Sequence, residues 1–356
     1  MTVRQVISAA DIRAARLERP DMRERDFAEA IGVSEGELLA AHIGFGVRAI
    51  TPDPDFIIPR LNALGEVMAL TRNDLVVHEK IGTYLNYVRR DATGLVLGPD
   101  IDMRIFPKRW AAGFAVEKAS KNGAVSHSFQ FFDPAGKAVH KVHTRPATDM
   151  AAWDALAAEG ALAAPEGAAP FSSVGDDLSP IRDTAAQTDV DGLVDEWANM
   201  QDTHEVPFIL AGYKLKRAAA LPLLGPDFAI GLPAELPARL VEAAAQRAVP
   251  LLIFARSTGC LQVHNGTVCN IVPMGPWINV MDARFHMHLR TDRTEPVHLV
   301  RKPTRHGDVV SVEVMDAGGD DALLFTAVRT MQGGDDTVWR ALLRHIIEPS
   351  IVPTWL

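Results

Sequence analysis

The chain has 356 residues, 47% of them hydrophobic and 23% charged, which is typical of a soluble globular protein with two domains or a duplicated one. Its formal net charge of −9 at pH 7 argues against a protein that binds nucleic acid without sequence preference. Two cysteines, an N-terminus without the apolar core of a signal peptide, and no apolar run near the roughly 18 residues of a membrane span together indicate a cytoplasmic protein.

The first forty residues are expected to be helical. Ser8 and Ser34 each precede acidic residues at the spacing of a helix N-cap. Residues 26–34 read DFAEAIGVS, which suits a helix–turn–helix with Gly32 at the end of its first helix. Such a motif could bind DNA, but its sequence signal is weak and its surroundings are acidic, so a small helical cap is the preferred interpretation.

From residue 64 the pattern changes to strands separated by turns that contain Gly, Asp and Pro. The sequence DPAGK, residues 133–137, lies between two alternating runs and predicts a hairpin. Residues 166–190 have the composition of a linker. We therefore predict one domain over residues 1–165 and a second over residues 191–356.

The second domain begins with a helical stretch over residues 191–247, which contains His204. Pro207 follows it closely and is expected to kink or end the helix. Strands return up to about residue 330, and TVWRALL, residues 337–343, predicts a last helix.

Helices followed by strands occur twice, which indicates a duplication. His78 superposes on His264 with an offset of 186 residues, and the same offset brings Arg104 onto Arg290; after a two-residue deletion, Lys118 falls on Lys302. The expected fold is α+β, with two similar tandem halves that each have a mostly antiparallel sheet and flanking helices.

Several side chains are candidates for chemistry. His286 and His288 alternate along one strand face, but no carboxylate or cysteine nearby completes a zinc site. His140 and His143 are expected to face solvent on a hairpin, and Cys260 to be a buried thiol. By local pattern His204 is either a surface histidine or an axial iron ligand. No phosphate loop, nucleophile elbow or dinucleotide fingerprint is present.

Over nearly its whole length the sequence resembles the bacterial cytoplasmic haemin-degrading factors, also described as haem-trafficking proteins, of haem-uptake operons. The segments that carry the resemblance in the first half include VMALTRNDLVVHEKIGTYLN, LVLGPDIDMRIFPKRWAAGFAV and SFQFFDPAGKAVHKVHTR. Those in the second half include DEWANMQDTHEV, GCLQVHNG, WINVMDARFHMHL and VRKPTRHGDVVSVEVMD.

The resemblance implies that b-type haem binds in a cleft between the two halves. It implies that His204, in the motif Asp-x-His, is the iron ligand and that Arg104 lies on the distal side. It also places Arg217, Lys302 and Arg329 near the haem propionates, whose burial requires cations. Arginine suits this role because its fork pairs with a carboxylate through two hydrogen bonds.

Two departures from the family pattern affect this site. Glu205, Val206 and Pro207 follow the ligand where the family has glutamine and aromatic residues. Leu324 and Thr326 replace a glutamine and a tyrosine near the propionates. These changes are expected to alter the geometry of the ligand helix and to remove two polar contacts.

The resemblance implies a cytoplasmic haem carrier that accepts imported haem from an inner-membrane transporter and delivers it onward, for example to a haem oxygenase. The alternative is an enzyme that opens the porphyrin ring; because no flavin or nicotinamide motif is present, its reductant would be external. A DNA-binding regulator is the third hypothesis, which the acidic charge disfavours, so no stable nucleic-acid partner is expected.

Overall fold

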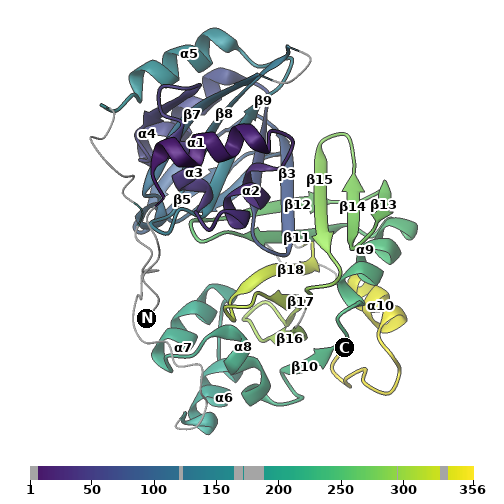
Figure 1. Ribbon diagram of the computed structural model, residues 1–356. Coiled ribbons are helices and arrows are strands. Elements are labelled where there is room, and N and C mark those ends of the chain that lie inside the picture. Colours follow the sequence, from purple (N-terminus) through teal and green to yellow (C-terminus); the bar gives the residue numbers. More distant parts are fainter. Residues whose placement is uncertain (1–6, 120–122, 164–170, 172–187, 295, 329–335) are drawn as a thin grey trace. The chain divides into compact units, whose positions relative to one another are not determined.

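The computed structural model describes residues 7–119, 123–163, 171, 188–294, 296–328 and 336–356. These residues form two compact units (Figure 1). Unit 1 takes its described residues from 1–72, 79–177 and 257–261, and unit 2 takes them from 73–78, 178–256 and 262–356. Most of the expected linker 166–190 lies outside the described residues.

Each unit includes a short segment from the other half of the sequence. Residues 257–261 belong to unit 1, where the carbonyl of Gly259 accepts hydrogen bonds from the backbone of Phe106 at 2.9 Å and from Nε1 of Trp110 at 3.0 Å. Residues 73–78 belong to unit 2, where the backbone N–H of Arg290 donates to the carbonyl of Leu75 at 2.9 Å. The units are thus not simple consecutive halves of the chain.

The strands of unit 1 are antiparallel and run in the order β1-β7-β8-β9-β2, with a second group β6-β5-β4. Strand β3 begins in unit 2 and ends in unit 1. The strands are β1 Val47–Ile50, β2 Val67–Arg72, β3 Val76–Gly82, β4 Tyr87–Arg90, β5 Thr93–Leu97, β6 Asp102–Ile105, β7 Ala112–Ala119, β8 Val125–Phe132 and β9 Ala138–Thr144. The helices are α1 Ala9–Glu18, α2 Glu24–Ala30, α3 Glu35–Ala41, α4 Pro54–Arg60 and α5 Met150–Glu159, with short 3-10 turns η1 Leu61–Leu64 and η2 Pro107–Arg109.

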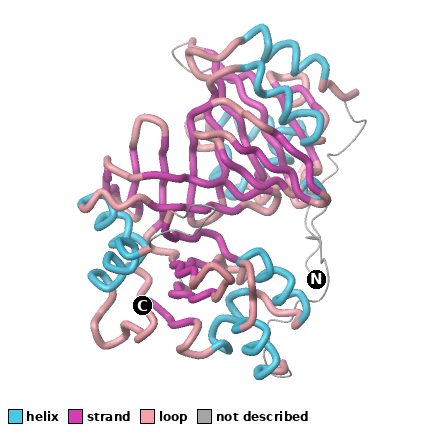
Figure 2. Tube along the Cα trace, turned by 180° about the vertical axis from the view of Figure 1, so that it is seen from behind, coloured by secondary structure: helices cyan, strands magenta, loops and turns pink. Residues whose placement is uncertain are grey.

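Unit 2 repeats this plan with the antiparallel order β10-β16-β17-β18-β11 and a second group β15-β14-β13. Its strands are β10 Ala229–Leu232, β11 Leu251–Arg256, β12 Cys260–Gly266, which begins in unit 1, β13 Ile271–Met274, β14 Trp277–Met281, β15 Phe285–Arg290, β16 Val297–Lys302, β17 Val309–Met315 and β18 Asp321–Ala327. Its helices and 3-10 turns are α6 Val190–Ala198, η3 Thr203–Glu205, α7 Val206–Gly212, α8 Arg217–Ala220, η4 Leu221–Leu224, α9 Leu236–Gln246 and α10 Thr337–Ile346. Figure 2 shows the helices of each unit alongside its strands.

The predicted α+β class, the antiparallel sheets and the duplication are confirmed. The DPAGK segment forms the turn between β8 and β9, and Gly136 takes a φ of 74°, which glycine adopts without a steric penalty. The strands β11 to β14 each start 184 residues after their counterparts β2 to β5, for example Leu251 after Val67. The offset of 186 expected for His78 was therefore wrong by two residues.

Two other local predictions were wrong. Strand β10 lies inside the stretch expected to be helical, because four residues at a sheet edge are too few to show an alternating pattern; it pairs with β16. His140 was expected to face solvent but is buried, where its ring bonds to the hydroxyls of Thr71 at 3.1 Å and Tyr84 at 2.5 Å. Burial lowers the pKa of His140 to about 3, so this imidazole is neutral.

The first helices of unit 2 pack against strands β16 and β17 of its sheet. Trp197 of α6 is fully buried, and Leu210 of α7 joins the same apolar cluster as Val300 of β16 and Met315 of β17. The indole Nε1 of Trp197 also donates to the carbonyl of Arg301 at 2.9 Å. These contacts anchor α6 and α7, and with them the segment between them, to the sheet.

Candidate functional site

His204 lies in the 3-10 turn η3, between α6 and α7, and 87% of its side chain is exposed. Its Nδ1 donates to Oδ1 of Asp202 at 2.6 Å, and its backbone N–H donates to the same oxygen at 2.9 Å. The pKa of Asp202 is lowered, mainly by the backbone hydrogen bond and further by the imidazole, so Asp202 is the acceptor. Among the described residues Nε2 of His204 has no partner and is the atom able to bind a metal.

The local sequence explains why the ligand segment forms a turn. Asp202 caps η3, and Glu205 reaches back to accept from the backbone N–H of Asp202 at 2.9 Å, which completes a capping box. Pro207 stands in the first turn of α7, where its missing N–H leaves no helical hydrogen bond unmade. Pro207 was expected to kink or end a helix, but it lies where a helix starts. Glu205, which departs from the family pattern, forms part of the cap of the turn.

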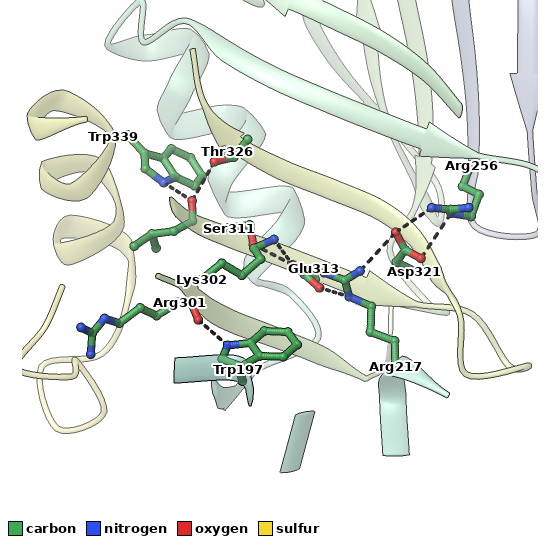
Figure 3. Close-up of polar contacts among 11 residues, drawn as sticks. Trp197, Arg217, Arg256, Arg301, Lys302, Ser311, Glu313, Asp321, Thr326 and Trp339 are labelled. Atoms are coloured by element: carbon green, nitrogen blue, oxygen red, sulfur yellow. Dashed lines mark hydrogen bonds and ion pairs between the residues drawn. The ribbon is translucent and has the colours of Figure 1, made fainter. Parts of the chain in front are cut away.

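Arg217 and Lys302 meet at the buried carboxylate of Glu313 (Figure 3). Nε and Nη2 of Arg217 donate to the two oxygens of Glu313 at 2.6 and 2.9 Å. Nζ of Lys302 and Oγ of Ser311 donate to Oε1 at 2.6 and 2.7 Å. The two predicted propionate-binding cations thus lie together, but they share an internal carboxylate that the sequence did not suggest.

The ionisation of this group follows from its partners. Burial would raise the pKa of Glu313, but the charges of Arg217 and Lys302 outweigh it and hold the pKa at about 2. Burial would lower the pKa of Arg217, but the Glu313 carboxylate reverses that effect and raises it. Burial lowers the pKa of Lys302, and Glu313 offsets only part of this change. Glu313 and Arg217 are therefore charged at neutral pH.

A second pair of charges borders the group. Asp321 lies 3.8 Å from Nη1 of Arg217 and 3.2 Å from Nε of Arg256 (Figure 3). The hydroxyl of Thr326 donates to the carbonyl of Val310 at 2.8 Å, so it is used within unit 2.

The other two arginines predicted for the site are Arg104 and Arg329. Arg104, on β6 of unit 1, pairs with Asp102 of the same strand and donates to the carbonyl of Met103 at 3.2 Å. Arg329 lies outside the described residues. In the parts of the chain that the structure describes, no three His, Cys, Asp or Glu side chains are placed to hold a metal ion. His288 instead bonds through Nδ1 to Oδ1 of Asn279 at 2.6 Å.

Glu313 is the residue that sequence reasoning missed. Its signal was a polar pair in an apolar strand: Ser311 and Glu313 are two residues apart in VVSVEVM, so they share one face of β17. A carboxylate on a buried strand needs a cation, and the basic residues Arg217 and Lys302 were already candidates. Because acidic side chains are frequent in this chain, the sequence alone did not distinguish Glu313 from the others.

The helices within the described part of the chain include none that is both long and apolar enough to cross a bilayer.

Comparison with known proteins gives consistent matches. Residues 32–159 and 214–346 match the family model described as the haemin-degrading HemS.ChuX domain. The chain is 33% identical over 342 residues to the hemin transport protein HmuS of Yersinia pestis, covering 95% of this chain and 96% of that protein. It is also 33% identical over 338 residues to the hemin transport protein HemS of Yersinia enterocolitica, covering 92% and 93%.

Solved structures extend the similarity to three dimensions. Holo-PhuS, a heme-binding protein from Pseudomonas aeruginosa, matches with a TM-score of 0.90 and 35% identity, covering 96% of this chain and 99% of that one. The heme degrading enzyme ChuS of Escherichia coli O157:H7 matches with a TM-score of 0.88 and 27% identity, covering 96% and 100%.

Proposed function

This chain belongs to the haemin-degrading HemS.ChuX family, and we propose that it is a haem carrier that accepts imported haem and passes it on intact. Relatives that match nearly its whole length are described as hemin transport and heme-binding proteins. We further propose that it acts in the cytoplasm, with an inner-membrane transporter as donor and a haem oxygenase as acceptor.

The observation that carries the proposal is the exposed, oriented imidazole of His204. A carboxylate that accepts from Nδ1 fixes the tautomer and raises the basicity of Nε2, which is the arrangement that metal-binding histidines generally have. The residues therefore fit haem, with Nε2 of His204 as iron ligand and with Arg217 and Lys302 toward the propionates. When bound, the haem supplies the iron that the imidazole ligates. Arg104 and Arg329 are proposed to contribute from the distal side and the propionate side.

A transfer function is consistent with one exposed ligand. The imidazole of His204 is 87% exposed on a short turn, so haem held there would be accessible to an acceptor while the sheet stays folded. Soret absorbance of a haem acceptor protein, mixed with the loaded carrier, tests this directly. Appearance of the acceptor's haem spectrum without loss of total haem is expected, and loss of the porphyrin absorbance without transfer would contradict it.

The second candidate is haem degradation, which the similarity to the heme degrading enzyme ChuS favours. Ring opening consumes the porphyrin and needs an external reductant, whereas a carrier returns the haem unchanged. Extraction of the pigment after incubation with a reductant and catalase separates the two, because catalase removes peroxide that would damage the ring without turnover.

We expect one haem per chain, although the fold is duplicated. The segment ERDFAEAIGV, which we expect to correspond in unit 1 to the ligand segment, contains no histidine. A titration of the protein with haemin, followed at the Soret band, should therefore reach its plateau at one equivalent. A plateau at two equivalents would contradict a single ligand site.

Replacing Asp202 by asparagine should weaken haem binding while leaving histidine ligation in place. The variant loses the negative charge that makes Nε2 a stronger ligand, and partners of this kind typically contribute about ten- to hundred-fold to metal affinity. Because Asp202 is half exposed and its charge is screened by solvent, we expect an effect below that range, roughly three- to ten-fold, in a Soret titration. Asp195→Asn, an exposed position on α6, is the matched control and should bind as the parent does.

A further inference from the structure

The carboxylate of Glu313 is saturated by its own protein. It is fully buried, and it accepts hydrogen bonds from Nε and Nη2 of Arg217, from Lys302 and from Ser311. Oε1 accepts three of these bonds and Oε2 one, which in number matches the roughly four acceptor positions of a carboxylate. Nε and Nη2 of the Arg217 guanidinium bind this carboxylate in a bidentate manner, as they would bind a ligand carboxylate.

When Lys302 is protonated, the group carries one more positive charge than Glu313 neutralises. Arg217 and Lys302 bring two cations to the single carboxylate of Glu313. Asp321 and Arg256, which border Arg217, cancel each other. His298 faces Glu313 across the β16–β17 ladder, and burial lowers its pKa, so it adds no charge at neutral pH. An excess buried cation is unfavourable unless an anion approaches it.

One nitrogen of Arg217, Nη1, is held only by a longer ion pair. Its Nη1 makes no hydrogen bond to any described residue, and the nearest carboxylate, Asp321, is 3.8 Å away. About a tenth of the Arg217 side chain is exposed, against 4% for Lys302 and none for Glu313. Of the three side chains Arg217 is thus the most accessible to a ligand carboxylate, which could pair with Nη1 while Glu313 stays bonded to Nε and Nη2.

We propose that Glu313 is an internal counter-ion that restricts the Arg217–Lys302 cluster to one external carboxylate at a time. This inference rests on the proposed haem-binding function and specifies how that site recognises a dicarboxylate porphyrin. Because one of the two cationic charges is already neutralised, the cluster attracts the porphyrin less strongly than two free cations would. That moderation suits a protein that has to release its ligand.

Metal-free protoporphyrin IX and its dimethyl ester test the proposal without any contribution from the iron–imidazole bond. The dissociation constant of the ester divided by that of the free acid, both measured by fluorescence, reports how strongly the protein recognises carboxylates. Glu313→Gln keeps the shape of the side chain but adds one net positive charge, so this ratio should rise roughly ten-fold, the scale of one charged hydrogen bond. An unchanged ratio in a folded Glu313→Gln protein would overturn the proposal.

The first unit offers a matched control. Glu35 is a buried carboxylate that pairs with Arg72 and Lys141, and its pKa is likewise held at about 2, with burial opposed by these two cations. Glu35→Gln therefore makes the same chemical change at a position with the same kind of partners. Its ester-to-acid ratio should equal that of the parent, and an equal rise in both variants would overturn the specific role of Glu313.

If Glu313→Gln does not fold, a crystal structure of the parent protein with bound haemin tests the proposal instead. Glu313 still paired with Arg217, and one propionate on Nη1, is the expected arrangement. A Glu313 side chain displaced from Arg217, or a cluster that binds both propionates or neither, would overturn it. A parent that does not bind haemin at all would refute the proposed function instead.

Discussion

Replacing His204 by alanine is expected to lower the affinity for haemin by about a hundred-fold or more. Partners outside the coordination sphere already contribute about ten- to hundred-fold to metal affinity, and here the ligand itself is removed. Because 87% of the side chain is exposed and it is not part of the buried core, the fold should be unaffected. Soret titrations of parent and variant measure the change, and far-UV circular dichroism checks the fold.

The control for this prediction is His345→Ala. His345 is an exposed histidine on α10 of the same unit, so its removal tests whether any surface imidazole supports haem binding. It should bind haemin as tightly as the parent. Equal losses in the two variants, or no loss in His204→Ala, would contradict the assignment of His204.

Replacing Glu313 by leucine should destabilise the protein by about 3–5 kcal/mol, the typical cost of removing one partner from a buried ion pair. The variant leaves the Arg217 guanidinium and the Lys302 ammonium buried without their shared carboxylate. Urea unfolding followed by far-UV circular dichroism gives the change in free energy. Lys118→Ala, which breaks an exposed pair with Glu24, is the control and should cost at most about 1 kcal/mol.

The same carboxylate should make stability depend on acid pH. Its pKa is about 2 in the folded protein against an ordinary 4.5, so an unfolded chain takes up this proton at higher pH. The stabilisation is therefore fully present above pH 4.5 and is lost as pH falls towards 2, by up to about 3 kcal/mol. Urea midpoints of parent and Glu313→Gln at several pH values between 5 and 2 should converge; a constant difference would contradict the expected titration.

Strand β2 and the hairpin turn were predictable because their signals are local. Buried and half-buried residues alternate along β2, as in a strand with one face in the core. The Asp-x-x-Glu spacing that caps the turn carrying His204 is also local, but the sequence there was interpreted as a helix that Pro207 kinks or ends. The hairpin at residues 133–137 follows from the need for glycine at a positive φ, met by Gly136. In each case the cause lies within a few residues of the effect.

The missed features depend on contacts between distant segments. His140 is buried because Thr71 and Tyr84, far away in the sequence, satisfy its ring. Glu313 is buried because a cation 96 positions earlier, Arg217, reaches it. Polarity alone predicts exposure for such side chains, and only the tertiary fold reveals the partners that make burial tolerable.

Magnetic circular dichroism of the ferric haem complex at pH 7.5, recorded for the parent and for His204→Ala, tests most directly whether His204 binds the iron. The parent should show the signature of a histidine-ligated haem, and the variant should lose it even where haem is retained through apolar and propionate contacts. An identical histidine signature in both proteins would remove His204 from the site and contradict the central assignment.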